Sequence, residues 1–176
     1  GDKLEARPKL AFGPILYAMH TLSRGTLNLT AQMPPLGEKE SQKLRLDAKD
    51  AKGTWQKITE APIDALSCTA TFRVAEWDDQ RDVAYRIALE DRSRDGTVRE
   101  RYFEGVIRKD PKERKEIVVA GFTGNKDTAF PNAKLVENVG IVDPDVLFFS
   151  GDQIYEDVGG YGIHRNPLDL AVLNYL

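Results

Sequence analysis

The residues best suited to chemistry follow an apolar run near the end of the sequence. Residues 141–157 read IVDPDVLFFSGDQIYED, in which the four apolar residues 146–149 precede Gly151 and Asp152. Such a run is typical of a parallel strand buried on both faces, and Gly151 allows a tight turn after it. Asp152 would then lie at the carboxyl end of the strand, the edge at which open α/β sheets bind ligands. An oxygen-rich set of side chains at this edge suits a hard divalent cation.

The Gly-Asp pair also has an ordinary structural explanation, because an Asp in a turn after a strand often caps the next helix. Its neighbours favour the metal site: Asp143-Pro144-Asp145 lies upstream, and Tyr155 and Glu156 lie downstream. Together these residues resemble the second sequence block of the metallophosphoesterases. The stretch GDQIYE at residues 151–156 is similar to the form found in the PhoD-like alkaline phosphatases and phosphodiesterases.

This resemblance implies a role for two residues. Asp152 would bind or bridge the active-site metals, and Tyr155 would be a further ligand. The cofactors implied are divalent metal ions, calcium with iron in the PhoD-like relatives, which would activate water for attack on a phosphoester. Glu156 and Asp157 would either orient the ligands or cap the loop.

The first metallophosphoesterase block, Asp-x-His, is absent. After an expected strand at residues 117–122, the chain reads Thr-Gly-Asn-Lys-Asp at residues 123–127, without the Cys that PhoD-like members often carry near this turn. Asn125 or Asp127 could replace the missing metal ligands. Alternatively, they belong to a polar turn, with Asp127 capping a helix that begins near Pro131.

The later histidine-bearing blocks of the superfamily are also missing. The sequence has two histidines, His20 and His164, and His164 follows a Gly-rich loop, so we expect a solvated residue there and assign no catalytic acid. Residues 167–176 are predicted to form a helix that runs to the last residue without a stop signal. We therefore expect the front portion of a longer phosphoesterase, inactive alone and with an exposed apolar sheet. Its partners would be a phosphoester substrate and the rest of the phosphatase domain beyond residue 176.

Before residue 116 the sequence alternates with the period of antiparallel strands. The inward positions expected from this alternation are Leu27, Leu29, Ala31, Leu44, Leu46, Phe72, Val74, Tyr85, Ile87, Leu89, Phe103, Gly105 and Ile107. Asp95-Gly96 predicts a hairpin between the last two strands. About seven strands in about a hundred residues favour a sandwich of the immunoglobulin or fibronectin type III kind. PhoD-like enzymes commonly carry such a sandwich before the catalytic domain.

The predicted fold is therefore mainly β, in two parts. An immunoglobulin- or fibronectin III-like β-sandwich accessory domain occupies residues 1–112, and a linker occupies residues 113–116. The first β-α-β unit of an α/β metallophosphoesterase domain occupies residues 117–176, where it is truncated. The competing hypothesis is a non-catalytic binding or adhesion module, in which the sandwich contacts glycan or protein and the phosphatase segment is vestigial.

Composition bears on membrane spans, disulfides, nucleic-acid binding and location. Hydrophobic residues make up 41% and charged residues 30%, as in ordinary soluble proteins. No apolar stretch approaches the roughly 20 residues of a spanning helix, so we expect no membrane span. Cys68 is the single cysteine, which excludes an internal disulfide. Acids are interleaved among the basic residues between positions 92 and 115, which argues against nucleic acid as a partner. The start at Gly1, without an initiator Met, suggests a mature sequence whose targeting peptide was left out. The resemblance to the mostly exported PhoD-like proteins then implies a periplasmic or secreted location.

Overall fold

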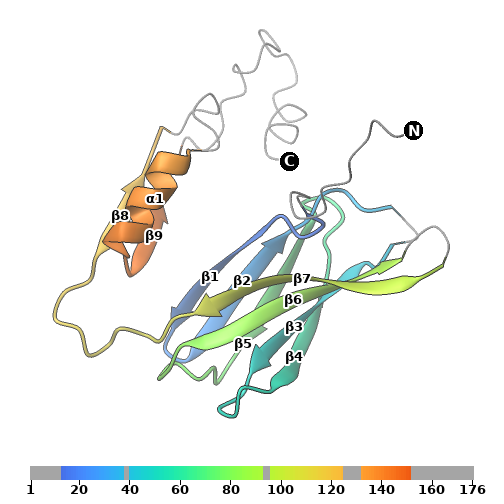
Figure 1. Cartoon of the computed structure of the whole chain (residues 1–176), viewed down its shortest axis with the longest axis horizontal. Coiled ribbons are helices and arrows are strands. Elements are labelled where there is room, and N and C mark those ends of the chain that lie inside the picture. Colours follow the sequence, from blue (N-terminus) through green and yellow to red (C-terminus); the bar gives the residue numbers. More distant parts are fainter. Residues whose placement is uncertain (1–12, 38–39, 93–95, 125–131, 152–176) are drawn as a thin grey trace, which may run out of the picture. The chain divides into compact units, whose positions relative to one another are not determined.

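The computed structural model describes residues 13–37, 40–92, 96–124 and 132–151, and the described part is mainly β (Figure 1). The chain divides into two compact units, Gly1–Asp110 and Pro111–Leu176. Two hydrogen bonds hold the last two residues of the first unit in place: Lys109 N donates to Asp82 Oδ1 at 2.9 Å, and Asp110 N donates to Asp79 O at 3.0 Å. None of the described helices is long and apolar enough to cross a membrane.

The first unit contains two antiparallel sheets. Strands β1 (Tyr17–Ser23), β2 (Thr26–Gln32) and β5 (Thr69–Val74) form one sheet in the order β1-β2-β5. Strands β3 (Lys43–Lys49), β4 (Trp55–Pro62), β6 (Val83–Arg92) and β7 (Val98–Ile107) form the other in the order β4-β3-β6-β7. All neighbours within these sheets run antiparallel, and a β-bulge shifts the β3–β4 register between Leu46 and Asp47.

The two sheets share one hydrophobic core, to which both contribute alternate side chains. The largest fully buried side chains are Phe72, Leu27, Leu29, Met33, Leu44, Leu46, Ile87 and Ile107. Apart from Met33, which follows β2, alternation predicts this set because each strand turns one face to the core and the other to solvent. The inward positions expected on β2, β3 and β6 are confirmed, whereas Val74 and Phe103 are half-buried. Trp77 is also buried, but it lies in the turn after β5.

Two hairpins explain how neighbouring strands meet. Arg24 and Gly25 both have positive φ, at 51° and 70°, between β1 and β2, as a type I′ turn requires. The predicted hairpin of β6 and β7 is confirmed by their pairing from Val83↔Ile107 to Arg92↔Val98, and Gly96 has φ 84°. Residues 93–95, including the Asp95 of that hairpin signal, lie outside the described part of the chain.

Within the β6–β7 pair, Tyr85 lies directly opposite Gly105. A Cβ atom added to Gly105 would come within 2.7 Å of Tyr85 Cε1 and 2.8 Å of its hydroxyl oxygen. The ring of Tyr85, which is 4% exposed, therefore covers the backbone of the neighbouring strand. Burial also raises the pKa of the Tyr85 hydroxyl. A Cβ at position 105 would therefore force this ring or the strand to shift.

The second unit contains strand β8 (Val119–Phe122), helix α1 (Ala133–Val142) and strand β9 (Val146–Phe149). The two strands pair in parallel, from Val119↔Val146 to Phe122↔Phe149. Strand β8 is two residues shorter than the expected 117–122. The helix has Asn132 as its N-cap, so the prediction that Asp127 caps it is wrong; the helix begins at Ala133, too far along the chain for that residue.

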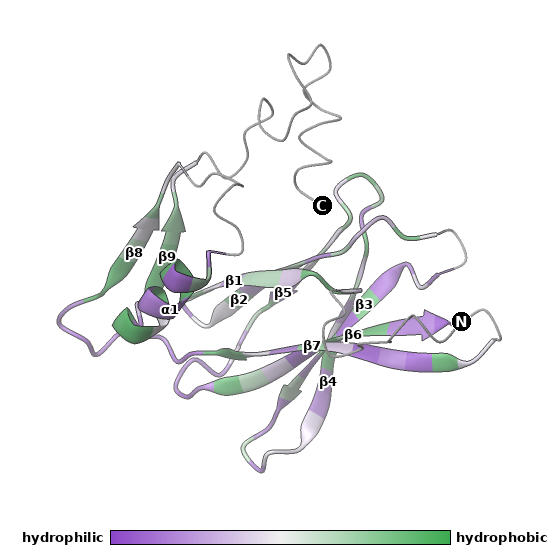
Figure 2. Cartoon of the chain, turned by 45° about the horizontal axis from the view of Figure 1, so that its top comes forward, coloured by the Kyte–Doolittle hydropathy of each residue, from purple (hydrophilic) through white to green (hydrophobic). Residues whose placement is uncertain are grey.

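The expected apolar exposure of this unit is confirmed among the described residues. All four residues of β9 are exposed, from 41% for Phe149 to 57% for Phe148, and none of the residues in α1 is buried. Figure 2 shows hydrophobic colouring along β8 and β9, in contrast to the largely hydrophilic β7. Parallel strands in proteins are almost always covered on both faces, so this unit presents a surface that is normally buried.

Candidate functional site

The carboxyl ends of β8 and β9 lie side by side, as the sequence predicts for a ligand-binding edge. Phe122 and Phe149 face each other in register, with their rings stacked at a centroid distance of 5.0 Å. Beyond them, Ser150 donates two hydrogen bonds to the carbonyl oxygen of Phe122, from its backbone N at 2.9 Å and its Oγ at 3.1 Å. The chain then leaves the two strands through Gly124 (φ 64°) and Gly151 (φ 131°).

The four predicted metal ligands are Asn125, Asp127, Asp152 and Tyr155, and all four lie outside the described residues. Asn125 follows Gly124 directly in the sequence, and Asp152 follows Gly151. Within the described ranges, no group of three or more His, Cys, Asp and Glu side chains could hold a metal ion. Whether the four predicted ligands come together thus stays a prediction.

The Asp-Pro-Asp segment before β9 has a structural role at the other end of the strands. Asp143 ends α1 in a left-handed conformation, and its backbone N donates to Val139 O at 3.0 Å. Asp145 accepts a hydrogen bond from the backbone N of Val118 at 3.0 Å and pairs with Arg114 at 2.6 Å. The Asp145 side chain is only 4% exposed, so its carboxylate fixes the amino ends of β8 and β9. Sequence reasoning missed this role because Val118 is 27 residues away.

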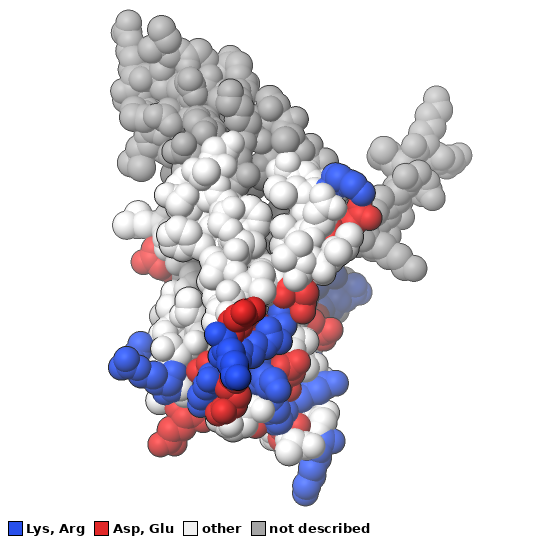
Figure 3. All heavy atoms as spheres, turned by 90° about the vertical axis from the view of Figure 1, so that its left-hand side faces the viewer, with Lys and Arg blue, Asp and Glu red and all other residues white. Residues whose placement is uncertain are grey.

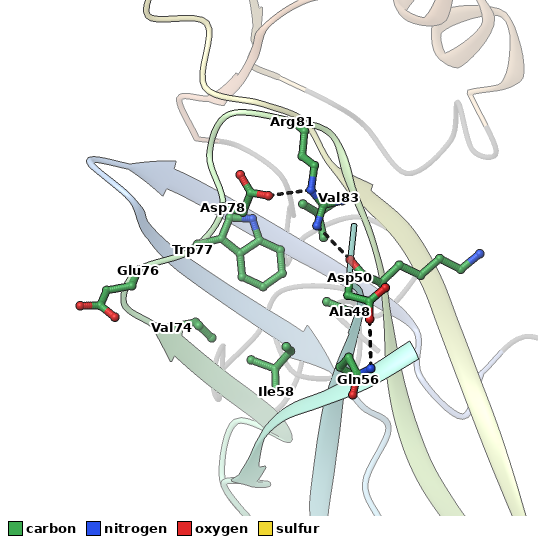
Figure 4. A pocket seen from close by; sticks show the side chains of 11 residues that line it. Ala48, Asp50, Gln56, Ile58, Val74, Glu76, Trp77, Asp78, Arg81 and Val83 are labelled. Carbon is green, nitrogen blue, oxygen red and sulfur yellow. Dashed lines mark hydrogen bonds and ion pairs between the residues drawn. The ribbon is translucent and has the colours of Figure 1, made fainter. Parts of the chain in front are cut away.

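A cavity of about 230 Å³ opens in the first unit, beside β4 and the turn after β5 (Figure 4). Its apolar lining comes from Ala48, Ile58, Val74, Trp77 and Val83. At its rim Arg81 is engaged internally: Arg81 Nε pairs with Asp78 at 2.6 Å, and Arg81 Nη2 donates to Lys49 O at 3.1 Å. Trp77 Nε1 is the one buried side-chain nitrogen or oxygen without a hydrogen-bond partner among the described residues. This cavity suits a small apolar group, but it presents no catalytic arrangement.

A second recess, of about 320 Å³, lies on the outer face of the β4-β3-β6-β7 sheet. Its lining residues are Arg45, Asp47, Trp55, Lys57, Glu60 and Arg86. At its centre Asp47 accepts hydrogen bonds from Arg45 Nε at 2.8 Å, Arg45 Nη2 at 3.1 Å and Arg86 Nε at 2.9 Å. The arginines cover the Asp47 side chain and leave it 4% exposed.

The basic side chains of this recess lower the pKa of its two carboxyl groups. Burial alone would raise the pKa of the Asp47 carboxyl, but the hydrogen bonds from Arg45 and Arg86 outweigh it, and the pKa lies below its ordinary value. Hydrogen bonds from Lys43 and Lys57 lower the pKa of Glu60 to about 2. Asp47 and Glu60 therefore carry their full negative charge at neutral pH. This cluster was not predicted, since it joins side chains from three strands, β3, β4 and β6.

Basic and acidic side chains are interleaved on the face drawn in Figure 3. Salt bridges also join neighbouring acids and bases near the β6–β7 hairpin: Arg92–Glu90 at 3.4 Å and Arg101–Asp91 at 3.0 Å. Comparison with known proteins found no matching family model and no significant match among curated proteins.

Proposed function

We propose that the second unit begins the catalytic domain of a metal-dependent phosphatase or phosphodiesterase of the PhoD-like kind, and that residues 1–176 alone are inactive. The observation that carries this proposal is the parallel β8–β9 pair, whose carboxyl ends meet at one edge through Phe122↔Phe149. Asn125 and Asp152 each follow a positive-φ glycine that comes shortly after one of these ends. Ligands of α/β sheets bind at such an edge.

The donor set fits divalent metal ions, because carboxylate, amide and phenolate oxygens are their common ligands. Asp152 would hold or bridge the ions, with Tyr155 as a further ligand and Asn125 and Asp127 contributed by the preceding loop. When bound, the ions would activate a water molecule for in-line attack on phosphorus and would stabilise the charge that develops on the phosphoryl oxygens. Calcium and iron are the ions implied by the resemblance.

For the first unit we propose a fibronectin type III-like accessory domain. Its strand order supports this assignment: β4 pairs with β3, in the sheet of β6 and β7, and not with β5. In the immunoglobulin constant-type sandwich, by contrast, the fourth strand pairs with the fifth. A periplasmic or secreted location, as in the PhoD-like relatives, fits this arrangement of an accessory domain before a phosphoesterase.

The second candidate function is a non-catalytic binding or adhesion module. The recess around Arg86 on the outer sheet face favours it, because a solvent-facing cluster of aromatic and arginine side chains is a common feature of binding surfaces. Under this alternative the β8–β9 segment is a vestigial phosphatase element.

Metal binding separates the two proposals. The full-length gene product is dialysed against Mn²⁺, Ca²⁺ or Fe²⁺, and the bound metal is counted for the wild type and for Asp152→Asn. We expect stoichiometric binding by the wild type and its loss in the variant, with Asp91→Asn as a control in the first unit, outside the predicted site. Equal metal content in all three proteins would contradict the phosphoesterase proposal.

A further inference from the structure

The recess on the outer face of the β4-β3-β6-β7 sheet is built around one arginine. The guanidinium carbon of Arg86 lies 4.5 Å from the ring centroid of Trp55 and 4.4 Å from that of Tyr102. These rings belong to β4 and β7, the two edge strands of the sheet, while Arg86 belongs to β6 within it. Cation–π contacts on two sides hold the guanidinium in one orientation.

The inner nitrogen of Arg86 is anchored as well. Arg86 Nε donates to Asp47 Oδ2 at 2.9 Å, and Asp47 also binds Arg45 through two hydrogen bonds. Arg45 Nη1 reaches Glu100, which in turn accepts a hydrogen bond from the Tyr102 hydroxyl. This network fixes the Arg86 side chain before any ligand arrives, so binding would cost little additional conformational entropy.

The two terminal nitrogens of Arg86 can donate hydrogen bonds to a ligand. Neither Nη1 nor Nη2 donates a hydrogen bond to another described residue, and the side chain keeps 20% of its surface exposed. Arginine presents its N–H groups as a planar fork, which pairs with two oxygens of an anion. Lys57, whose side chain is 58% exposed and whose Nζ pairs with Glu60 at 2.8 Å, supplies a second cation to the same recess.

We propose that this recess binds a single oxyanion group, with two of its oxygens on the fork of Arg86 and a third or neighbouring oxygen near Lys57. The charge balance supports an anion, since three cations (Arg45, Lys57 and Arg86) and two anions (Asp47 and Glu60) line the recess. A volume of about 320 Å³ accommodates a carboxylate, phosphate or sulfate group together with part of the molecule that carries it. The site belongs to the first unit and does not depend on the proposed metal site.

The test is a titration of ¹⁵N-labelled residues 1–176 followed by NMR, with sulfate, inorganic phosphate and acetate as probes at constant ionic strength. The reporters are the Nε–H signal of Arg86 and the indole N–H signal of Trp55. We expect saturable shifts of both signals, with a dissociation constant on the order of 1 mM for the best probe. Shifts that do not saturate, or that are equally large for Arg73 on the other sheet, would overturn the proposal.

Three variants separate binding from folding. Arg86→Lys keeps the charge but loses the fork, and we expect at least tenfold weaker binding. Lys57→Gln removes the exposed ion pair with Glu60, which keeps Lys43, and leaves the contacts of Arg86 with Trp55, Tyr102 and Asp47 intact. It should therefore fold normally and bind several-fold more weakly. Arg73→Lys is the matched control and should bind like the wild type. Unchanged affinity in Lys57→Gln and Arg86→Lys would refute the site.

The probes also distinguish the source of the anion. Preference for acetate would indicate a carboxylate, as in an acidic peptide, whereas preference for phosphate or sulfate would indicate an ester group. Either preference supports the oxyanion site and fixes its chemical class.

Discussion

Replacing Gly105 by Ala tests the packing of β7 against the buried ring of Tyr85. The new Cβ would lie 2.7 Å from Tyr85 Cε1 and 2.9 Å from Cζ. Ordinary carbon–carbon contacts are about 3.5–4.0 Å, so the ring or the strand would have to move by roughly 1 Å. Tyr85 is 4% exposed and cannot swing into solvent. Such overpacking costs about 1–3 kcal/mol, partly offset by the roughly 0.4–1 kcal/mol that Gly→Ala gains by restricting the unfolded chain.

Urea unfolding followed by tryptophan fluorescence measures this effect, because both tryptophans, Trp55 and Trp77, belong to the first unit. We expect Gly105→Ala to lower the free energy of unfolding by about 1–2 kcal/mol in the wild-type background. In a Tyr85→Leu background the ring is gone, and the same substitution should be neutral or slightly stabilising. An equal loss in both backgrounds would refute the steric explanation, since the cost would then not depend on Tyr85.

Three further predictions concern a turn and two buried carboxylates. Arg24→Asn should stabilise the first unit by several tenths of a kcal/mol, because Asn tolerates the positive φ that a type I′ turn requires before Gly25; a lower urea midpoint would contradict this. The lowered pKa of Asp47 means that its stabilisation is complete above its unfolded pKa near 3.8 and is lost as the pH falls through the folded value. Wild type and Asp47→Asn should therefore differ in stability at pH 7 and converge toward pH 2, whereas a constant difference would exclude ionic pairing. Asp145→Ala should speed amide exchange at Val118 about tenfold or more, since it removes the acceptor of that N–H; unchanged exchange would show that the hydrogen bond is unimportant.

The strands of the first unit could be predicted because apolar and polar residues alternate along an antiparallel strand that has one buried face. Leu27, Leu29 and Ala31 alternate with polar residues and are all fully buried. The apolar run at residues 146–149 likewise predicted a parallel strand, and β9 occupies it. Local patterns are enough for such elements: alternation reports which side of an antiparallel strand faces the core, and a short continuous apolar run is typical of a parallel strand.

Contacts between distant segments could not be predicted in this way. Asp145 looked like part of a metal-binding block, yet its carboxylate is bound to Val118 and Arg114. The stacking of Arg86 between Trp55 and Tyr102 depends on the pairing of four strands and on the bulge after Leu46. A sequence shows which residues face outward on a strand, but the register decides which of them meet. The predicted ligands Asn125, Asp127, Asp152 and Tyr155 remain predictions, because they lie outside the described residues.

The most direct test of the proposed function is hydrolysis of bis(p-nitrophenyl) phosphate by the full-length gene product, with and without a chelator. The proposal predicts hydrolysis that the chelator abolishes, that divalent metal restores, and that Asp152→Asn reduces by at least a hundredfold because a metal ligand is lost. Hydrolysis that is insensitive to both the chelator and Asp152→Asn, or no hydrolysis by a folded, metal-loaded protein, would contradict it and favour the binding module.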